Sequence, residues 1–194
     1  GVGYCLGGTL LTMAAAWLAR EKRNPFCALT LLAAQTDFSD AGDLRLFINE
    51  SQLSMLEAVM AKNGFLPKES MAGTFTLLRA NYLLWSRWVK EYLLGERQHP
   101  NDLLTWNKDA TRMPARMHAE YLRQCYLHNS LASGQFMVDN RPIALADIQV
   151  PLFVVGTAKD HVAPWQSVYK INLLIDKDIT FLLTNGGHNA GIIS

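Results

Sequence analysis

A cysteine between closely spaced glycines is the most reactive feature of this sequence. Residues 3–8 read Gly-Tyr-Cys-Leu-Gly-Gly, where a short apolar lead-in gives way to an Ala/Leu-rich run. Glycines two positions before and after a nucleophile allow a sharp turn from strand to helix. A thiol at a helix N-terminus also faces unpaired N–H groups that stabilise its thiolate. The spacing predicts that Cys5 is a nucleophile; the alternative is a small buried cysteine in a Gly-rich turn.

A carboxylate and an imidazole follow two apolar runs near the other end of the chain. The run 150–156 leads into Asp160, and the run 179–184 leads through Asn-Gly-Gly into His188. Both runs have the composition of buried strands. Because a parallel sheet gathers its strand ends along one edge, we expect Cys5, Asp160 and His188 to meet there.

Acyl transfer explains why these three residue types are needed together. A cysteine that attacks a carbonyl needs an imidazole to take its proton, and a carboxylate fixes the tautomer of that imidazole. The oxyanion would accept a hydrogen bond from the backbone N–H of Leu6, and a second donor is expected upstream of Gly1. Whether Asp160 orients the imidazole or activates an attacking hydroxyl itself stays open. His161 follows the acid directly and is an alternative base. The order along the chain of nucleophile, acid and histidine, each at a strand end, favours His188.

The elements that must position these residues alternate between strand and helix. A helix is expected over 6–23 and a strand over 27–33, before the strands at 150–156 and 179–184. Helical composition then extends over about 50–63, 71–94 and 114–131, with no convincing parallel strand. The sequence predicts a core at 1–37 and 149–194 and a mostly helical cap insertion at 38–148, which would exclude water from the nucleophile.

Four motifs, in this order, resemble those of polyhydroxyalkanoate synthases, the bacterial polyester polymerases of the α/β-hydrolase superfamily. They are G-x-C-x-G-G at 3–8, W-N-x-D at 106–109, D-H-x-x-P-W at 160–165 and G-H-x-A-G at 187–191. The likeness runs nearly the whole length of the chain. Asn189 departs from the pattern, since an aliphatic residue is common there, and we expect it to tune the histidine loop.

The resemblance implies an α/β-hydrolase fold, partial because the first strands are absent, and an acyltransferase that polymerises (R)-3-hydroxyacyl-coenzyme A. It makes Cys5 the acyl-carrying nucleophile, Asp160 the acid and His188 the base. No cofactor is expected, since the substrate carries coenzyme A. Candidate substrate-binding residues are Tyr4, Trp106, His161 and Trp165. The chain is expected to be a fragment, inactive or poorly folded alone.

Two other functions remain open from the sequence. One is a cysteine-nucleophile esterase or thioesterase of the same fold, and the other is a non-catalytic granule-binding fragment. Aromatic residues of the cap, such as Tyr82 and Trp85, fit either core packing or contact with another subunit or a polyester surface. The resemblance implies a cytoplasmic homodimer at the granule surface, with granule-associated proteins as possible partners.

Composition argues against several other classes. The chain has 194 residues, 18 basic against 17 acidic, so it lacks the charge of a nucleic-acid-binding protein. Three cysteines at unrelated spacings suggest neither a disulfide framework nor a metal site. No apolar run approaches the roughly 18 residues of a membrane span, and no secretory signal is visible.

Overall fold

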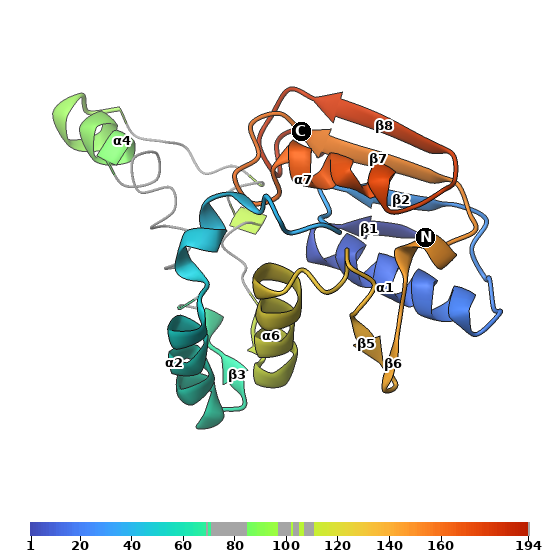
Figure 1. The fold of residues 1–194 in the computed structure, drawn as a ribbon. Helices are drawn as coiled ribbons and strands as arrows, with labels where there is room; N and C mark the ends of the chain where they lie inside the picture. The colour runs from blue at the N-terminus through green and yellow to red at the C-terminus, as the bar shows by residue number, and fades with distance from the viewer. Residues whose placement is uncertain (69, 71–84, 97–101, 103–104, 107–110, 194) are drawn as a thin grey trace. The chain divides into compact units, whose positions relative to one another are not determined.

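The computed structural model describes residues 1–68, 70, 85–96, 102, 105–106 and 111–193 (Figure 1). The chain divides into two compact units, one formed by Gly1–Asn49 with Tyr121–Ser194 and the other by Glu50–Glu120. Both divisions fall inside the region 38–148 that the sequence analysis assigned to a cap.

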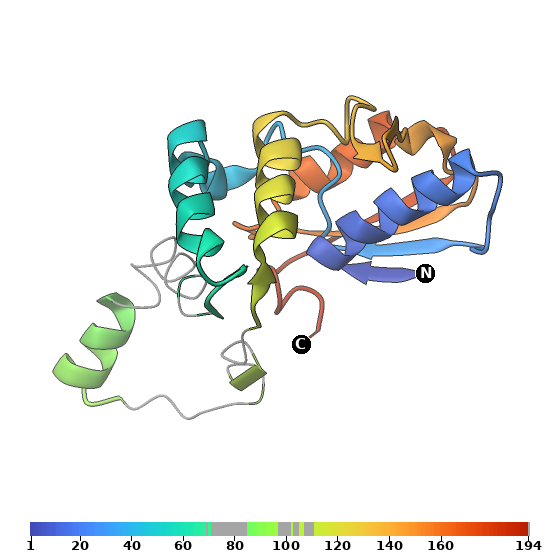
Figure 2. The same cartoon turned by 90° about the horizontal axis from the view of Figure 1, so that it is seen from below.

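The first unit is built on a four-stranded parallel sheet in the order β1-β2-β7-β8. Its strands are Val2–Tyr4, Leu29–Leu32, Leu152–Thr157 and Ile179–Thr184. Helix α1 (Leu6–Arg20) connects β1 to β2, and α7 (Trp165–Tyr169) lies between β7 and β8. Both connections step in the same direction across the sheet, so right-handed crossovers place both helices on one face (Figures 1 and 2). Because all four strands are parallel, they end at the same edge of the sheet.

Side-chain alternation explains which face is covered. Leu29, Leu31 and Val154 point to the helix-covered face and are fully buried. The neighbouring positions point to the other face, where Val2 and Phe153 are exposed. The core of this unit thus lies between the sheet and its two helices.

Short elements complete the first unit. They are the 3-10 helices η1 (Gly42–Phe47), η5 (Leu145–Asp147) and η6 (Lys170–Leu173), the π-helix η4 (Leu122–Leu127), and the hairpin strands β5 (Met137–Val138) and β6 (Arg141–Pro142). Arg20, at the end of α1, donates hydrogen bonds to three backbone carbonyls of this hairpin, at 2.8 to 3.2 Å. The hairpin is thereby attached to the helix that follows the cysteine.

The described part of the second unit is helical with one short strand pair. Its elements are α2 (Glu50–Ala61), β3 (Phe65–Leu66), α4 (Ser86–Trp88), the π-helix η3 (Val89–Leu93), β4 (Met113–Pro114) and α6 (Ala115–Tyr121), whose last residue begins the return to the first unit. Strands β3 and β4 pair antiparallel.

Most of the expected elements are confirmed, with changed ends. The strand at 179–184 matches β8, the expected strands at 27–33 and 150–156 form β2 and β7, and the helix over 6–23 ends at Arg20. Of the helix expected over 71–94, residues 71–84 lie outside the described residues. No helix in the described ranges is both long and apolar enough to cross a membrane.

Candidate active site

Cys5 occupies the tight turn between β1 and α1. Its backbone has φ 52° and ψ −127°, in the region that favours glycine, and its N–H donates to Leu32 O at 2.9 Å. The flanking glycines permit a very close approach of strand and helix. A Cβ on Gly3 would lie 2.5 Å from Gly8 Cα, and one on Gly8 would lie 2.4 Å from Ala34 Cβ. Packing therefore requires glycine at positions 3 and 8, whereas a Cβ on Gly7 would meet nothing within 4 Å.

Leu6 is the first residue of α1. N–H groups in the first turn of a helix have no acceptor within the helix, so they are available to an anion. This position suits the predicted oxyanion role of the Leu6 N–H, which stays a prediction.

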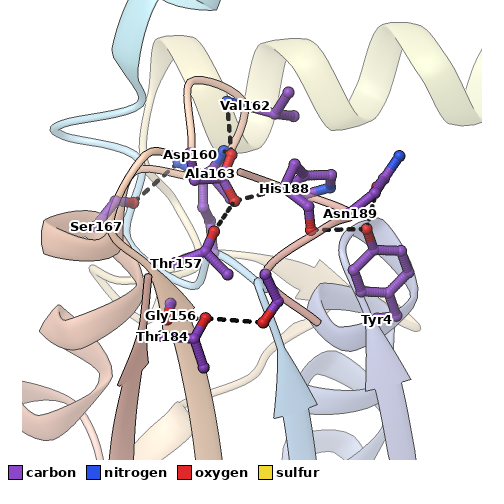
Figure 3. Close-up of polar contacts among 12 residues, drawn as sticks. Tyr4, Gly156, Thr157, Asp160, Val162, Ala163, Ser167, Thr184, His188 and Asn189 are labelled. Carbon is purple, nitrogen blue, oxygen red and sulfur yellow. Dashed lines mark hydrogen bonds and ion pairs between the residues drawn. The ribbon is translucent and has the colours of Figure 1, made fainter. Parts of the chain in front are cut away.

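Asp160 lies just past the end of β7 and is held by four donors (Figure 3). The N–H groups of Val162 and Ala163 donate to its Oδ1 at 2.8 and 2.9 Å, and Thr157 Oγ1 donates to its Oδ2 at 3.0 Å. His188 contacts the same Oδ2. Burial opposes ionisation, but the hydrogen bonds and the charge of His188 outweigh it and lower the pKa of Asp160. The residue is therefore a buried, ionised carboxylate.

The histidine loop follows β8 and is tied to the acid loop. Lys159 N–H donates to Gly186 O at 2.8 Å, and Thr184 Oγ1 donates to Gly191 O at 2.8 Å. Glycine is needed at position 191, since a Cβ there would lie 2.6 Å from Thr157 Cγ2. The first hydrogen bond holds the two loops side by side at the sheet edge, and the second ties the histidine loop to the end of β8.

His188 joins the cysteine to the carboxylate. Its Nδ1 lies 2.7 Å from Asp160 Oδ2, and the side chain of Cys5 lies near enough to the ring to raise its pKa. Burial lowers the pKa of His188, but the interactions of the ring with Asp160 and Cys5 outweigh burial and raise the pKa from 6.5 to about 9. With Nδ1 engaged by the carboxylate, Nε2 is the nitrogen left for the sulfur. The structure thus brings together the three residues that the sequence singled out.

The four candidate substrate-binding residues have different surroundings. Tyr4 stacks on the His188 ring, with centroids 5.3 Å apart, and its hydroxyl donates to His188 O at 3.0 Å. Trp165 begins α7 and packs edge-on against Tyr169, and His161 is partly exposed beside Asp160. Trp106, in the second unit, is half exposed. Substrate binding by all four stays a prediction.

Two contributors to the site were missed from the sequence. Thr157 donates to Asp160, and its place three residues before the acid at a strand end was a usable signal. The backbone donors at 162 and 163 form a turn of the kind that an aspartate commonly caps, which is a second usable signal.

The arrangement suits nucleophilic acyl transfer. A thiol beside an imidazole that is itself oriented by a carboxylate is the pattern of an activated nucleophile. No cluster of three or more His, Cys, Asp or Glu side chains in the described ranges has the arrangement of a metal site.

Comparison with curated proteins gives relatives that are named poly(3-hydroxyalkanoate) polymerases. The chain is 42% identical over 193 residues to the poly(3-hydroxyalkanoate) polymerase subunit PhaC of Rhizobium meliloti (strain 1021), covering 100% of this chain and 32% of the relative. It is 37% identical over 199 residues to the PhaC subunit of Cupriavidus necator, covering 100% of this chain and 34% of that protein. The predicted resemblance to polyester synthases is confirmed, and the chain spans about a third of the length of these curated relatives.

Solved structures agree on the fold. A monoacylglycerol lipase from Paleococcus ferrophilus aligns over 97% of this chain and 59% of its own, with a TM-score of 0.53 at 12% identity. A hydrolase from Pseudomonas aeruginosa aligns over 96% of this chain and 56% of its own, with a TM-score of 0.52 at 17% identity. The family model for the alpha/beta hydrolase fold matches residues 2–193. The predicted fold class is thereby confirmed, and the chain belongs to the alpha/beta hydrolase fold family.

Proposed function

We propose that this chain carries the catalytic centre of a polyester synthase, an acyltransferase that polymerises (R)-3-hydroxyacyl-coenzyme A through an acyl group held on Cys5. One observation carries the proposal: His188 contacts Asp160 at 2.7 Å through Nδ1, and Cys5 lies near enough to the same ring to raise its pKa. The sequence identity of 42% and 37% to proteins named as polymerases, over the whole of this chain, supports the choice of substrate class.

The first half-reaction loads the enzyme. The Cys5 proton passes to His188 Nε2, and the sulfur attacks the thioester carbonyl while the Leu6 N–H stabilises the oxyanion. The bond between the acyl carbon and the coenzyme A sulfur breaks, and the imidazolium returns the proton to that sulfur. Free coenzyme A and an acyl-cysteine result. The raised pKa of His188 suits this step, because it keeps the proton on the ring at neutral pH.

The second half-reaction extends the chain. A hydroxyl of another monomer or of the growing polymer gives its proton to the now neutral His188 and attacks the acyl carbon. The bond to Cys5 breaks, and the sulfur takes the proton back. An ester has formed and the thiol is restored, so no cofactor is needed beyond the coenzyme A that the substrate brings.

The contacts of Asp160 support an orienting role. Its two oxygens already accept four hydrogen bonds, and its lowered pKa makes it a weak base. A carboxylate so engaged has no free lone pair directed at an incoming hydroxyl, so we assign proton removal to His188 and orientation of the ring to Asp160.

Exposed aromatic residues of the second unit suit contact with a polymer surface. Trp88 and Tyr92 stack with ring centroids 5.8 Å apart, and both are more than half exposed. Exposed apolar surface of this kind commonly marks a site of interaction with another molecule. We therefore extend the proposal to a cytoplasmic enzyme at the polyester granule; a homodimer remains an expectation from the resemblance.

The test uses a full-length protein that contains this chain, incubated with 3-hydroxybutyryl-coenzyme A. Polymer and free coenzyme A are the expected products, and Cys5→Ala should abolish both. Cys27→Ala is the matched control, since it removes an exposed thiol before β2 and should leave turnover unchanged. Release of 3-hydroxybutyrate without polymer would instead assign a thioesterase. Full turnover by Cys5→Ala would contradict the nucleophile.

A further inference from the structure

The residue before the nucleophile contacts the residue after the base. Tyr4 ends β1, and its hydroxyl reaches across to the histidine loop, where it hydrogen-bonds both His188 O and the side chain of Asn189 (Figure 3). Its ring lies nearly parallel to the imidazole, with an angle of 28° between the planes. Three contacts thus connect the nucleophile strand to the loop that carries the base.

The donors and acceptors of this cluster can all be satisfied. A phenol has one proton, which Tyr4 donates to His188 O. The phenol oxygen can then accept from the Asn189 amide when that amide presents its NH₂ group. Burial, with the negative charges of Cys5 and Asp160, raises the pKa of Tyr4, so the hydroxyl stays protonated and remains a donor.

The placement of these contacts matters for His188. Its Nδ1 is held by Asp160 and its other edge faces Cys5, so the ring can still tilt or slide in the direction that neither partner restrains. The Tyr4 ring lies against one face of the imidazole, and the Tyr4 hydroxyl holds the backbone of the same residue.

We propose that Tyr4 and Asn189 form a clasp that positions His188 between Cys5 and Asp160. Tyr4 is then a positioning residue for the base and not a substrate-binding one, which revises its expected role. The inference deepens the proposed function and rests on it, because it assumes that His188 transfers protons to and from Cys5.

The test compares Tyr4→Phe, Asn189→Ala and the double variant in a full-length protein that contains this chain. Tyr4→Phe keeps the stacked ring and removes only the hydroxyl. Tyr169→Phe is the matched control, because it removes the hydroxyl of a half-exposed tyrosine on α7. Coenzyme A release from 3-hydroxybutyryl-coenzyme A is followed in a single turnover and at steady state.

Each single variant should slow acylation about five- to tenfold, the value of one hydrogen bond, with KM changed less than about twofold. The double variant should be no slower than the slower single one, since both changes open the same clasp. Tyr169→Phe should match the unaltered protein. Single variants within twofold of the unaltered protein, a change in KM alone, or effects that multiply would each overturn the clasp.

A second measurement does not depend on turnover. The titratable groups that face His188 in the described structure are Cys5 from the elbow, Asp160 from the acid loop and Tyr4 from β1. Loosening the ring should weaken its interactions with the first two, so the imidazole titration seen by NMR of ¹³C-labelled histidine should move down by about half a pH unit or more in Tyr4→Phe. An unmoved titration would refute the clasp even if Cys5→Ala had already refuted the proposed function.

Discussion

Replacing Asp160 by asparagine should reverse the hydrogen bond to His188 while keeping the shape of the loop. Two backbone N–H groups, of Val162 and Ala163, point at Oδ1 and leave room there only for an acceptor. The asparagine must therefore place its oxygen at that site and its NH₂ group toward Thr157 and His188. The NH₂ group donates to Nδ1, which forces the ring proton onto Nε2, so Nε2 can no longer accept the Cys5 proton.

The magnitude follows from what the carboxylate does for the imidazolium. The pKa of His188 rises from 6.5 to about 9 against the effect of burial. That difference, 9 − 6.5 = 2.5, corresponds to about 3 kcal/mol at 1.36 kcal/mol per pH unit, shared between Asp160 and Cys5. Asparagine removes the part of this stabilisation that Asp160 supplies, and the wrong tautomer slows proton transfer further. We therefore expect turnover to fall about 10³- to 10⁴-fold.

Single-turnover coenzyme A release separates the two roles considered for Asp160. If the carboxylate orients His188, Asp160→Asn slows acylation and chain extension alike. If the carboxylate instead activated the hydroxyl, the first release of coenzyme A would stay fast and only later turnovers would fail. Asp37→Asn is the matched control, since Asp37 is another hydrogen-bonded carboxylate with a lowered pKa, and its Oδ1 accepts from Ser39 and Asn129, so its loss should leave turnover within about threefold. A fast first release by Asp160→Asn would refute our assignment.

Two further outcomes test the site and its frame. Because the pKa of His188 is raised, the proton that the ring takes from Cys5 stays on it below about pH 9 and can be returned to the coenzyme A sulfur, so kcat/KM for coenzyme A release should fall as pH rises through that value; a fall already near 6.5 would contradict the influence of Asp160 and Cys5 on the ring. Gly8→Ala should lower the free energy of unfolding by about 1–3 kcal/mol through overpacking, since its Cβ would lie 2.4 Å from Ala34 Cβ. Gly7→Ala meets nothing within 4 Å and should be neutral or stabilising, so equal thermal unfolding of the two variants would disprove the packing argument.

The core strands and the three central side chains could be predicted because their signals are local. The apolar run at 150–156 ends at a polar loop and the run at 179–184 at a Gly-rich one, and the parallel sheet brings these ends to one edge. The close approach of strand and helix at Cys5 requires glycine at positions 3 and 8. Order along the chain and strand ends were therefore sufficient to place Cys5, Asp160 and His188 together.

Features that depend on side-chain contacts between distant segments could not be predicted. The contact of Tyr4 with Asn189 joins residues that no periodicity connects. The β5–β6 hairpin was missed although its turn residues, Asp139 and Asn140, are types that tolerate positive φ; both adopt it, at 51° and 57°. The helix expected over 114–131 runs as α6 and continues directly into the π-helix η4, which ends at Leu127; the sequence gives no sign of this change of pitch.

The backbone angles of Cys5 have a consequence for engineering. Residues with a side chain in that region store about 1–3 kcal/mol of strain, whereas glycine adopts it freely. A library selected on heat resistance alone would therefore enrich glycine at position 5 and discard the sulfur. Thermostabilised versions of such a protein should be sought elsewhere in the chain, with this turn left untouched, because here durability and reactivity select opposite residues.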